Sequence, residues 1–227
     1  MSTQIERVRA ALEDEAGIDE PIGQLDISED DGVVTIAGSV ASLADKRRAI
    51  HAARDAAGGQ NVQDALEVAS EDRPGDDQLA SAVDRALRSD PAFQGATIRR
   101  DQGGGDASWI TISTEDGVVT LAGRVGSPSH RRLAEVHAWW QGAARVDNAL
   151  EVDPPREDSA AELKEALTLV VERDRALDGA EIDLAVHGST VTLAGRAASR
   201  QQAARAERNC WAVEGVREVR NELIVAP

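Results

Sequence analysis

One eight-residue pattern occurs three times along the chain and constrains its fold more than any other feature. Asp-Gly-Val-Val-Thr-Ile-Ala-Gly occupies residues 31–38, Asp-Gly-Val-Val-Thr-Leu-Ala-Gly occupies residues 116–123, and a looser Ser-Thr-Val-Thr-Leu-Ala-Gly occupies residues 189–195. Repetition of this kind is typical of tandem copies of one structural unit. We therefore interpret the chain as three copies of one unit, called repeats 1, 2 and 3.

Each pattern is typical of a strand that follows a tight turn. Asp-Gly supplies the positive φ angles that a two-residue hairpin turn needs, and the next residues alternate with a period of two. The inward-facing pairs are predicted to be Val34 with Ile36, Val119 with Leu121, and Val191 with Leu193, which leaves Thr35, Thr120 and Thr192 on the opposite face. The first strand of each hairpin is predicted at residues 25–28, 110–113 and 182–185.

A helix and a last strand are predicted after each hairpin. A serine four residues beyond the closing glycine can cap the helix, and small residues then recur at i, i+4 spacing on one helical face. The serines are Ser42, Ser127 and Ser199, and the small residues are Ala49 with Ala53, Ala134 with Ala138, and Ala206 with Cys210. The last strands, at 62–68, 146–152 and 219–225, share the pattern Asp/Asn-x-Leu-x-Val.

A further helix precedes each hairpin, with apolar residues at helical spacing within 5–12, 79–87 and 163–170. Because a strand-helix-strand crossover makes its two strands parallel, the sheet should be mixed. We predict an α+β fold: three tandem two-layer units, each a three-stranded mixed sheet with two helices on one face. The predicted units span residues 1–70, 76–153 with an inserted loop at 91–106, and 159–226.

These shared features resemble the BON domain, and three tandem copies would cover nearly the whole chain. The resemblance rests on the order of elements, the Val-Thr-Ile/Leu-Ala-Gly core, the serine and alanine positions, and the terminal Asp/Asn-x-Leu-x-Val. It implies a bacterial protein associated with the envelope or with stress responses. It also implies binding of phospholipid surfaces or other proteins, without catalysis; one cytoplasmic relative binds potassium.

The net charge of −16 restricts the classes of partner. Repeat 1 carries most of this charge, with 16 acidic against 7 basic residues in 1–73. Such a field repels nucleic acid and anionic lipid, so we expect no nucleic-acid partner. The basic runs 46–48 and 131–132, on the predicted second helices, are interpreted as solvated faces.

The N-terminus lacks a basic head followed by an apolar run, and no window has the length of a membrane span. A single cysteine, Cys210, excludes an internal disulfide and suits a reducing compartment. These features predict a cytoplasmic protein without a transmembrane segment.

No set of residues points to catalysis, a cofactor or a metal. The four histidines are not spaced as metal ligands, and the glycines at 103–105 lack the lysine and hydroxyl residue of a phosphate-binding loop. The acidic run 29–31 lacks the ligand spacing of a calcium loop and is more typical of an exposed turn. We therefore predict no enzyme activity.

The tryptophans suggest one candidate binding site. At 100° per residue, Trp139 and Trp140 fall on opposite flanks of the second helix of repeat 2, so one of them should be largely exposed. The flank with Trp140 also carries Leu133 and His137, whereas the other repeats place charged, polar or small residues there. Such an apolar flank is typical of a binding anchor. Alternatively, the segment with Phe93 folds over the flank and buries it.

The sequence thus predicts a non-enzymatic protein-interaction or scaffold module whose partner contacts Leu133, His137 and Trp140. The alternative is a protein that binds a phospholipid surface or a small cation such as potassium. The sequence does not identify the partner or the oligomeric state.

Overall fold

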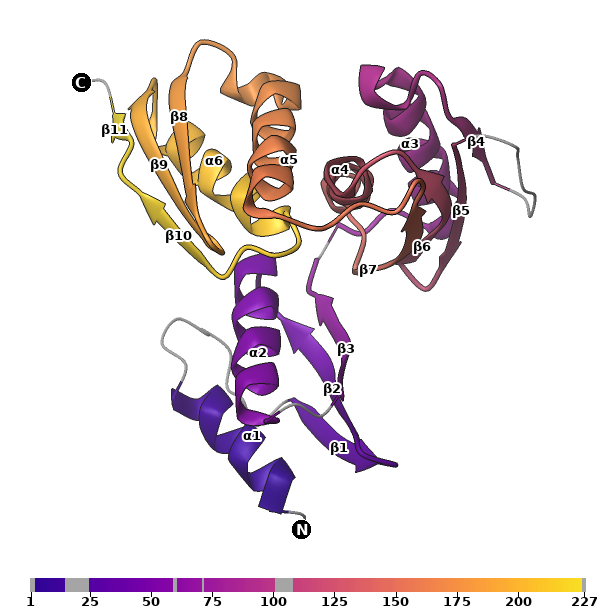
Figure 1. Ribbon diagram of the computed structural model, residues 1–227, viewed down its shortest axis with the longest axis vertical. Helices are drawn as coiled ribbons and strands as arrows, with labels where there is room; N and C mark the ends of the chain where they lie inside the picture. Colours follow the sequence, from indigo (N-terminus) through magenta and orange to yellow (C-terminus); the bar gives the residue numbers. More distant parts are fainter. Residues whose placement is uncertain (1–2, 15–24, 59–60, 71, 101–107, 226–227) are drawn as a thin grey trace. The chain divides into compact units, whose positions relative to one another are not determined.

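The computed structural model describes residues 3–14, 25–58, 61–70, 72–100 and 108–225. Within them, each repeat has the predicted order of helix, hairpin, helix and strand (Figure 1). The chain forms two compact units: residues 1–71 hold repeat 1, and residues 72–227 hold repeats 2 and 3 together. The prediction of an α+β fold with three repeated units is confirmed.

Repeat 1 is a mixed sheet with two helices. Strand β2 is central, with β1 antiparallel and β3 parallel to it. The elements are α1 (Thr3–Asp14), β1 (Asp26–Asp30), β2 (Val33–Val40), α2 (Leu43–Ala56) and β3 (Asn61–Val68).

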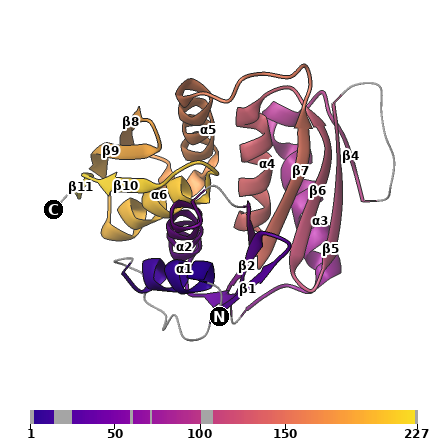
Figure 2. The same ribbon diagram turned by 60° about the horizontal axis from the view of Figure 1, so that its bottom comes forward.

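Repeat 2 repeats this arrangement and adds a short strand. Its sheet has the order β4-β5-β6-β7, and helices α3 and α4 both pack on it and on each other (Figure 2). The elements are α3 (Asp76–Ser89), the 3-10 turn η2 (Pro91–Phe93), β4 (Thr97–Arg99), β5 (Trp109–Glu115), β6 (Val118–Val125), α4 (Pro128–Trp140) and β7 (Arg145–Val152).

Repeat 3 has the same order but a divided last strand. Its segments β10 and β11 both pair in parallel with β9, and β8 pairs with β9 in antiparallel fashion. The elements are α5 (Ala160–Arg173), η3 (Arg175–Leu177), β8 (Glu181–His187), β9 (Thr190–Ala197), α6 (Arg200–Ala212), β10 (Glu218–Asn221) and β11 (Ile224–Val225).

The shared pattern has a structural reason at both ends. Asp31 and Gly32 have φ angles of 46° and 78°, the two positive values of a hairpin turn that matches the strand twist. At the other end, a Cβ atom on Gly123 would lie 2.1 Å from the Trp109 carbonyl oxygen, and one on Gly195 would lie 2.0 Å from that of Glu181. The closing glycine therefore allows the two hairpin strands to approach.

The predicted inner faces are confirmed. The six apolar residues expected to point at the helices are fully buried, whereas the three threonines are partly exposed. The three serines cap α2, α4 and α6, each accepting a hydrogen bond from the backbone N–H three residues on. The small residues of the second helices are also fully buried, so these helices lie close to their sheets.

The Asp/Asn of the last strand fixes that strand to the second helix. Asn148 donates from its side-chain amide to the Arg131 carbonyl oxygen at 3.1 Å, and Asn221 donates in the same way to Ala203 at 3.1 Å. In repeat 1 the aspartate Asp64 instead pairs with Lys46 at 2.5 Å. The interpretation of Lys46 as solvated was wrong, since this side chain is buried against Asp64 and the Leu66 carbonyl oxygen.

The described part of the predicted inserted loop, residues 91–100, contains regular secondary structure. It begins with η2, the counterpart of η3 in repeat 3, and continues into β4, which pairs in parallel with β5 so that Ile98 lies opposite Ile110. The glycines at 103–105 lie outside the described residues. The additional sequence therefore supplies an extra edge strand to the sheet of repeat 2.

Candidate functional site: the α4 flank and the junction of repeats 2 and 3

The structure brings Leu133, His137 and Trp140 together on α4, where repeat 3 packs. Leu133 is fully buried, His137 is 7% exposed, and Trp140 is partly buried. The Trp140 Nε1 donates to Asn209 Oδ1 on α6 of repeat 3 at 3.1 Å. Helix α4 also packs extensively along α5 (Figure 2). In this structure the flank contacts repeat 3 of the same chain.

The expectation that one tryptophan would be largely exposed was wrong. Trp139 is also partly buried, and its Nε1 donates to Glu135 Oε1 at 3.1 Å within α4. Phe93 packs on the flank as the alternative expected, with its ring 6.2 Å from that of His137. The helical-wheel prediction placed the two tryptophans on opposite flanks of α4. It considered repeat 2 alone, and so it did not include the burial that packing of repeat 3 provides.

A buried carboxylate, Asp90, organises one end of the junction. It caps η2 by accepting from the Ala92 N–H at 2.8 Å, and it pairs with His137 Nε2 at 2.9 Å and with Arg173 Nε of repeat 3 at 3.2 Å. Burial alone would raise the pKa of Asp90, but the hydrogen bonds from His137, Ala92 and Arg173, together with the charge of His137, lower it to about 2. Asp90 is therefore a charged link between the two repeats.

Asp174 has the equivalent position in repeat 3. It caps η3 through the Ala176 N–H at 3.1 Å and accepts from Arg205 Nε at 2.5 Å and from the Asn209 side-chain amide at 2.7 Å. Burial opposes the charged form, but the bonds from Arg205 and Asn209 outweigh it and lower the pKa of Asp174. Since Asn209 also accepts from Trp140, this second network continues into α4.

The first turns of α4 make the other end of the junction. The Arg132 guanidinium binds both Asp158 carboxylate oxygens, at 2.9 and 2.6 Å, and its Nε donates to the Glu214 carbonyl oxygen at 2.7 Å. The Ser129 N–H donates to Glu162 Oε2 at 3.2 Å, and Arg131 pairs with the Glu214 side chain at 2.5 Å. The interpretation of residues 131–132 as a solvated face was wrong, because Arg132 is buried in this contact.

The titratable groups of the junction are engaged with one another or buried. The carboxylate of the Asp90–His137 pair is already engaged by Arg173 and by the cap of η2. The Cys210 thiol is fully buried, and burial together with the charge of Glu207 raises its pKa to about 12, which keeps it protonated. Among the described residues, no group of three or more His, Cys, Asp or Glu side chains is placed to hold a metal ion.

The sequence reasoning missed Asp90, Asp174 and Asn209, although a signal for the aspartates was present. Residues 90–96 read Asp-Pro-Ala-Phe-Gln-Gly-Ala, and residues 174–180 read Asp-Arg-Ala-Leu-Asp-Gly-Ala. The shared Asp-x-Ala-apolar-x-Gly-Ala stands at different distances from the closing glycines because repeat 2 contains the additional strand. An alignment anchored only on the hairpins therefore does not superpose the two aspartates.

Comparisons with known proteins agree with this repeat structure. The chain matches the BON domain family three times, over residues 2–70, 75–154 and 159–227. No match was found among curated proteins. None of the helices in the described part of the chain is long and apolar enough to cross a membrane.

Two solved structures are similar over most of this chain. One is the C-terminal domain of CdsD, a structural protein of the type III secretion system of Chlamydia trachomatis, with 12% identity, coverage of 100% of this chain and 99% of that chain, and a TM-score of 0.27. A second structure of CdsD has 13% identity, coverage of 98% and 92%, and a TM-score of 0.27. With the three family matches spanning nearly its whole length, the chain belongs to the BON domain family and carries three BON domains in tandem.

Proposed function

We propose that this protein is a non-enzymatic bacterial scaffold whose BON domains bind proteins through a flank of their second helix. The observation that carries the proposal is the α4 flank, which packs along α5 and donates from Trp140 to Asn209 of α6. One BON domain of this chain therefore uses this surface to hold another folded domain. The equivalent helices α2 and α6 would offer the corresponding surface of repeats 1 and 3 to protein partners.

The charge distribution of the junction supports a binding role. Asp90 and Asp174, whose pKa values are lowered, are the capping carboxylates of η2 and η3, and each is neutralised by an arginine. Shifted carboxylates at a catalytic centre would instead face a cavity that could admit a substrate. Here they hold helices together.

A protein partner is favoured over an anionic membrane by electrostatics. A chain with a net charge of −16 is repelled by anionic headgroups, and membrane-surface binding usually combines an apolar anchor with basic residues. The apolar flank with Trp140 is largely covered by repeat 3, which reduces the anchor available to a bilayer.

Vesicle co-sedimentation combined with chemical cross-linking tests the proposal. In the first assay, the full chain is mixed with vesicles of phosphatidylcholine, or of phosphatidylglycerol with cardiolipin. In the second assay, it is cross-linked in bacterial lysate, and the linked lysines and carboxylates are mapped by mass spectrometry. We expect the protein to stay in the supernatant with either kind of vesicle. We also expect it to form cross-links to defined proteins, and we expect the cross-linked residues to lie on the second helices. Sedimentation with either vesicle, without reproducible protein cross-links, would refute the proposal.

A further inference from the structure

The first hairpin strand of repeat 3, β8, has an open outer edge. Within the described residues, β8 pairs only with β9, so the side of the strand that faces away from β9 has no neighbouring strand. Strand β8 is seven residues long and contains neither proline nor lysine. Proteins usually protect edges of this kind, because their backbone N–H and C=O groups can pair with another chain.

In repeat 2 the same edge is occupied. Strands β5 and β8 are equivalent, since each has an isoleucine opposite the closing glycine of the next strand: Ile110 in repeat 2 and Ile182 in repeat 3. Strand β4 pairs in parallel with β5 and places Ile98 beside Ile110. Repeat 3 has no such strand, because η3 leads directly into β8. The BON fold of this chain therefore accepts an added strand at an edge that repeat 3 leaves open.

The inner face of β8 is less well covered than that of β5. Ile110 and Ile112 are 0% and 1% exposed. Their counterparts Ile182 and Leu184 are only half-buried, although Leu193, opposite Leu184 on β9, is fully buried. A strand in the place of β4 would cover the exposed part of both side chains. Apolar burial would thus add to backbone pairing.

The outer face of β8 is acidic. Glu181 and Asp183 are exposed, and neither carboxylate forms an ion pair within the described part of the chain. The only basic residue of β9 is Arg196, which lies opposite Glu181 without pairing with it. Because opposite charges on adjacent strands attract, this face favours basic side chains on an added strand.

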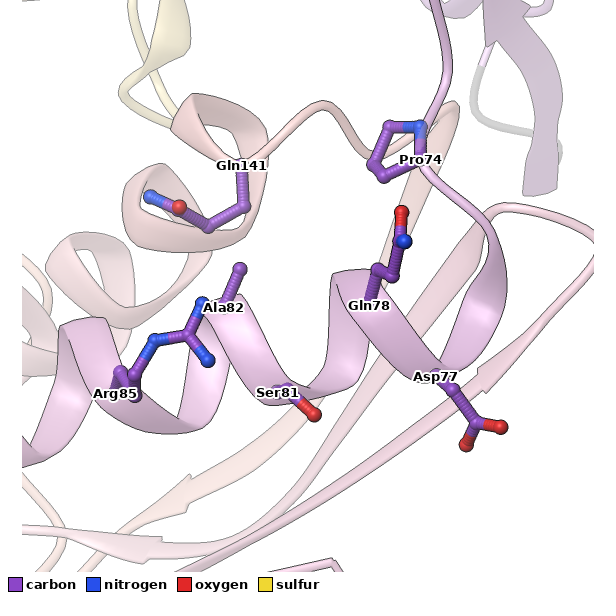
Figure 3. Close-up of a pocket in the computed structure, with 7 residues that line it drawn as sticks. All are labelled: Pro74, Asp77, Gln78, Ser81, Ala82, Arg85 and Gln141. Atoms are coloured by element: carbon purple, nitrogen blue, oxygen red, sulfur yellow. The ribbon is translucent and has the colours of Figure 1, made fainter.

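Helix α3 shows how the first helix of a repeat contacts such a strand. Arg88 donates to a backbone carbonyl oxygen of β4. Arg100, directly after β4, donates to Ser81 Oγ at 3.0 Å and to Asp77 Oδ1 at 3.2 Å. Asp77 and Ser81 also line the open pocket drawn in Figure 3, where both side chains point away from Gln141 at the end of α4. The added strand is thus held by α3 as well as by β5.

The corresponding positions on α5 are more acidic. Helices α3 and α5 have the same length and each is followed by a capping aspartate, so Glu172 has the place of Arg88 and Glu165 that of Ser81. Ala161 replaces the aspartate. Both glutamates are exposed. Together with the two carboxylates of β8, they surround the open edge with negative charge, so the added strand has to supply the positive charge.

We propose that the edge of β8 binds an extended segment of another protein, which adds in parallel and carries basic residues on both sides of an apolar one. The apolar residue would lie beside Ile182, as Ile98 lies beside Ile110, and the basic residues would lie beside Glu181 and Asp183. This surface is separate from the flanks of the second helices and adds a second way of binding proteins.

A labelled peptide and the full chain, mixed in a fluorescence anisotropy titration, test the proposal. The peptide Arg-Ile-Arg-Val-Ser-Val-Thr matches residues 181–187 one for one and places arginine beside both carboxylates. The control Glu-Ile-Glu-Val-Ser-Val-Thr differs only in those charges. We expect the basic peptide to bind with a Kd below about 1 mM, and the acidic peptide to bind about tenfold more weakly or not at all. Absence of binding by the basic peptide would overturn the proposal.

A charge exchange tests the site. Glu181→Arg combined with Asp183→Arg should weaken binding of the basic peptide by about tenfold or more and allow the acidic peptide to bind, which also shows that the variant is folded. Glu6→Arg combined with Glu157→Arg changes the net charge equally at exposed sites away from β8, and it should leave the preference for the basic peptide unchanged. Equal effects of the two double variants would show attraction to the whole acidic chain and refute the site.

Backbone N-methylation tests strand pairing. Methyl groups on alternate peptide nitrogens leave the side chains unchanged, and only one of the two alternating sets faces β8. We expect methylation of one set to abolish binding and methylation of the other set to preserve it; equal binding of both peptides would overturn the proposal. A paramagnetic tag on the peptide N-terminus should broaden the amide NMR signal of Glu181 more than that of His187, and the reverse would refute the parallel orientation.

Sedimentation velocity distinguishes the remaining occupant, a second copy of this chain. We expect the chain alone to keep the mass of one molecule. A larger mass that the basic peptide reduces would identify a second copy on β8 and refute a different protein. None of these measurements involves the second helices, so a failure here leaves the proposed function unaffected.

Discussion

Replacing Asp90 with asparagine should destabilise residues 72–227 in a way that depends on pH. Asparagine keeps the shape and can still cap the Ala92 N–H, so the change removes mainly the charge that pairs with His137 and Arg173. The pKa of this carboxyl falls from its ordinary value of 3.8 to about 2 on folding. With about 1.4 kcal/mol for each pKa unit, the charge contributes about 2 kcal/mol to the free energy of unfolding near neutral pH.

The sign of the pH dependence follows from the lowered pKa. The contribution is present in full above the unfolded-state pKa and is lost as the pH falls toward the folded-state pKa, because the protonated acid resembles asparagine. The stability difference between wild type and Asp90→Asn should therefore be about 2 kcal/mol at about pH 7 and should fall to about 0.4 kcal/mol near pH 2, where the folded-state carboxyl is half protonated.

Urea unfolding followed by tryptophan fluorescence measures this difference. All four tryptophans of the sequence lie within residues 72–227, so the emission reports this unit and not repeat 1. Glu165→Gln, at an exposed site on α5, is the control and should change stability by less than about 0.5 kcal/mol. An equal loss at both ends of the pH range, or no loss near neutral pH, would refute a charged link at the junction.

Three further outcomes are expected from the same structure. Truncating the fully buried Ile36 to alanine should lower the stability of repeat 1 by about 2 to 5 kcal/mol in circular dichroism melts, with Thr35→Ala as a mild control; a loss below about 1 kcal/mol would contradict the strand register. Arg132→Ala should lower the free energy of unfolding of residues 72–227 by about 2 kcal/mol in the fluorescence assay, since it removes a bidentate ion pair; the loss stays moderate because the remaining partner, Asp158, is largely exposed. An unchanged urea midpoint would show that the contact contributes nothing to stability. The Cys210 thiol should resist an aromatic disulfide reagent at about pH 8 until urea unfolds the protein, and rapid labelling of the native state would contradict its burial.

The fold was predictable because local patterns specify it. The Asp-Gly turn at 31–32, the period of two in β2 and the serine cap at Ser42 act over a few residues, and each occurs again in register. Three agreeing copies make the pattern clear even though repeat 3 lacks the Asp-Gly turn. The short strand β4 was not predicted, since three residues are too few to show a period, and neither were the 3-10 turns η2 and η3.

The junction was not predictable because its partners are distant in the sequence. Asp90 is hydrogen-bonded to Arg173, and Trp140 is hydrogen-bonded to Asn209. The two residues of each pair lie far apart in the sequence, so no local pattern links them. The charged side chain of Arg132 also looks like a surface residue until its partner Asp158 is known. Sequence alone therefore located the unusual flank of α4 but not the repeat that covers it.

The junction combines an apolar flank with ion pairs, and this combination determines which repeats can associate. A second helix without an arginine at the position of Arg132 would lose the bidentate pair with Asp158 and would leave the Glu214 carbonyl oxygen without this donor. Helix α6 lacks that arginine, having Ala204 instead, whereas α2 has Arg47. Three domains with nearly the same fold thus differ at one helical position, where α4 and α2 have an arginine and α6 has an alanine, and only the arginine of α4 has an acidic partner on the next repeat.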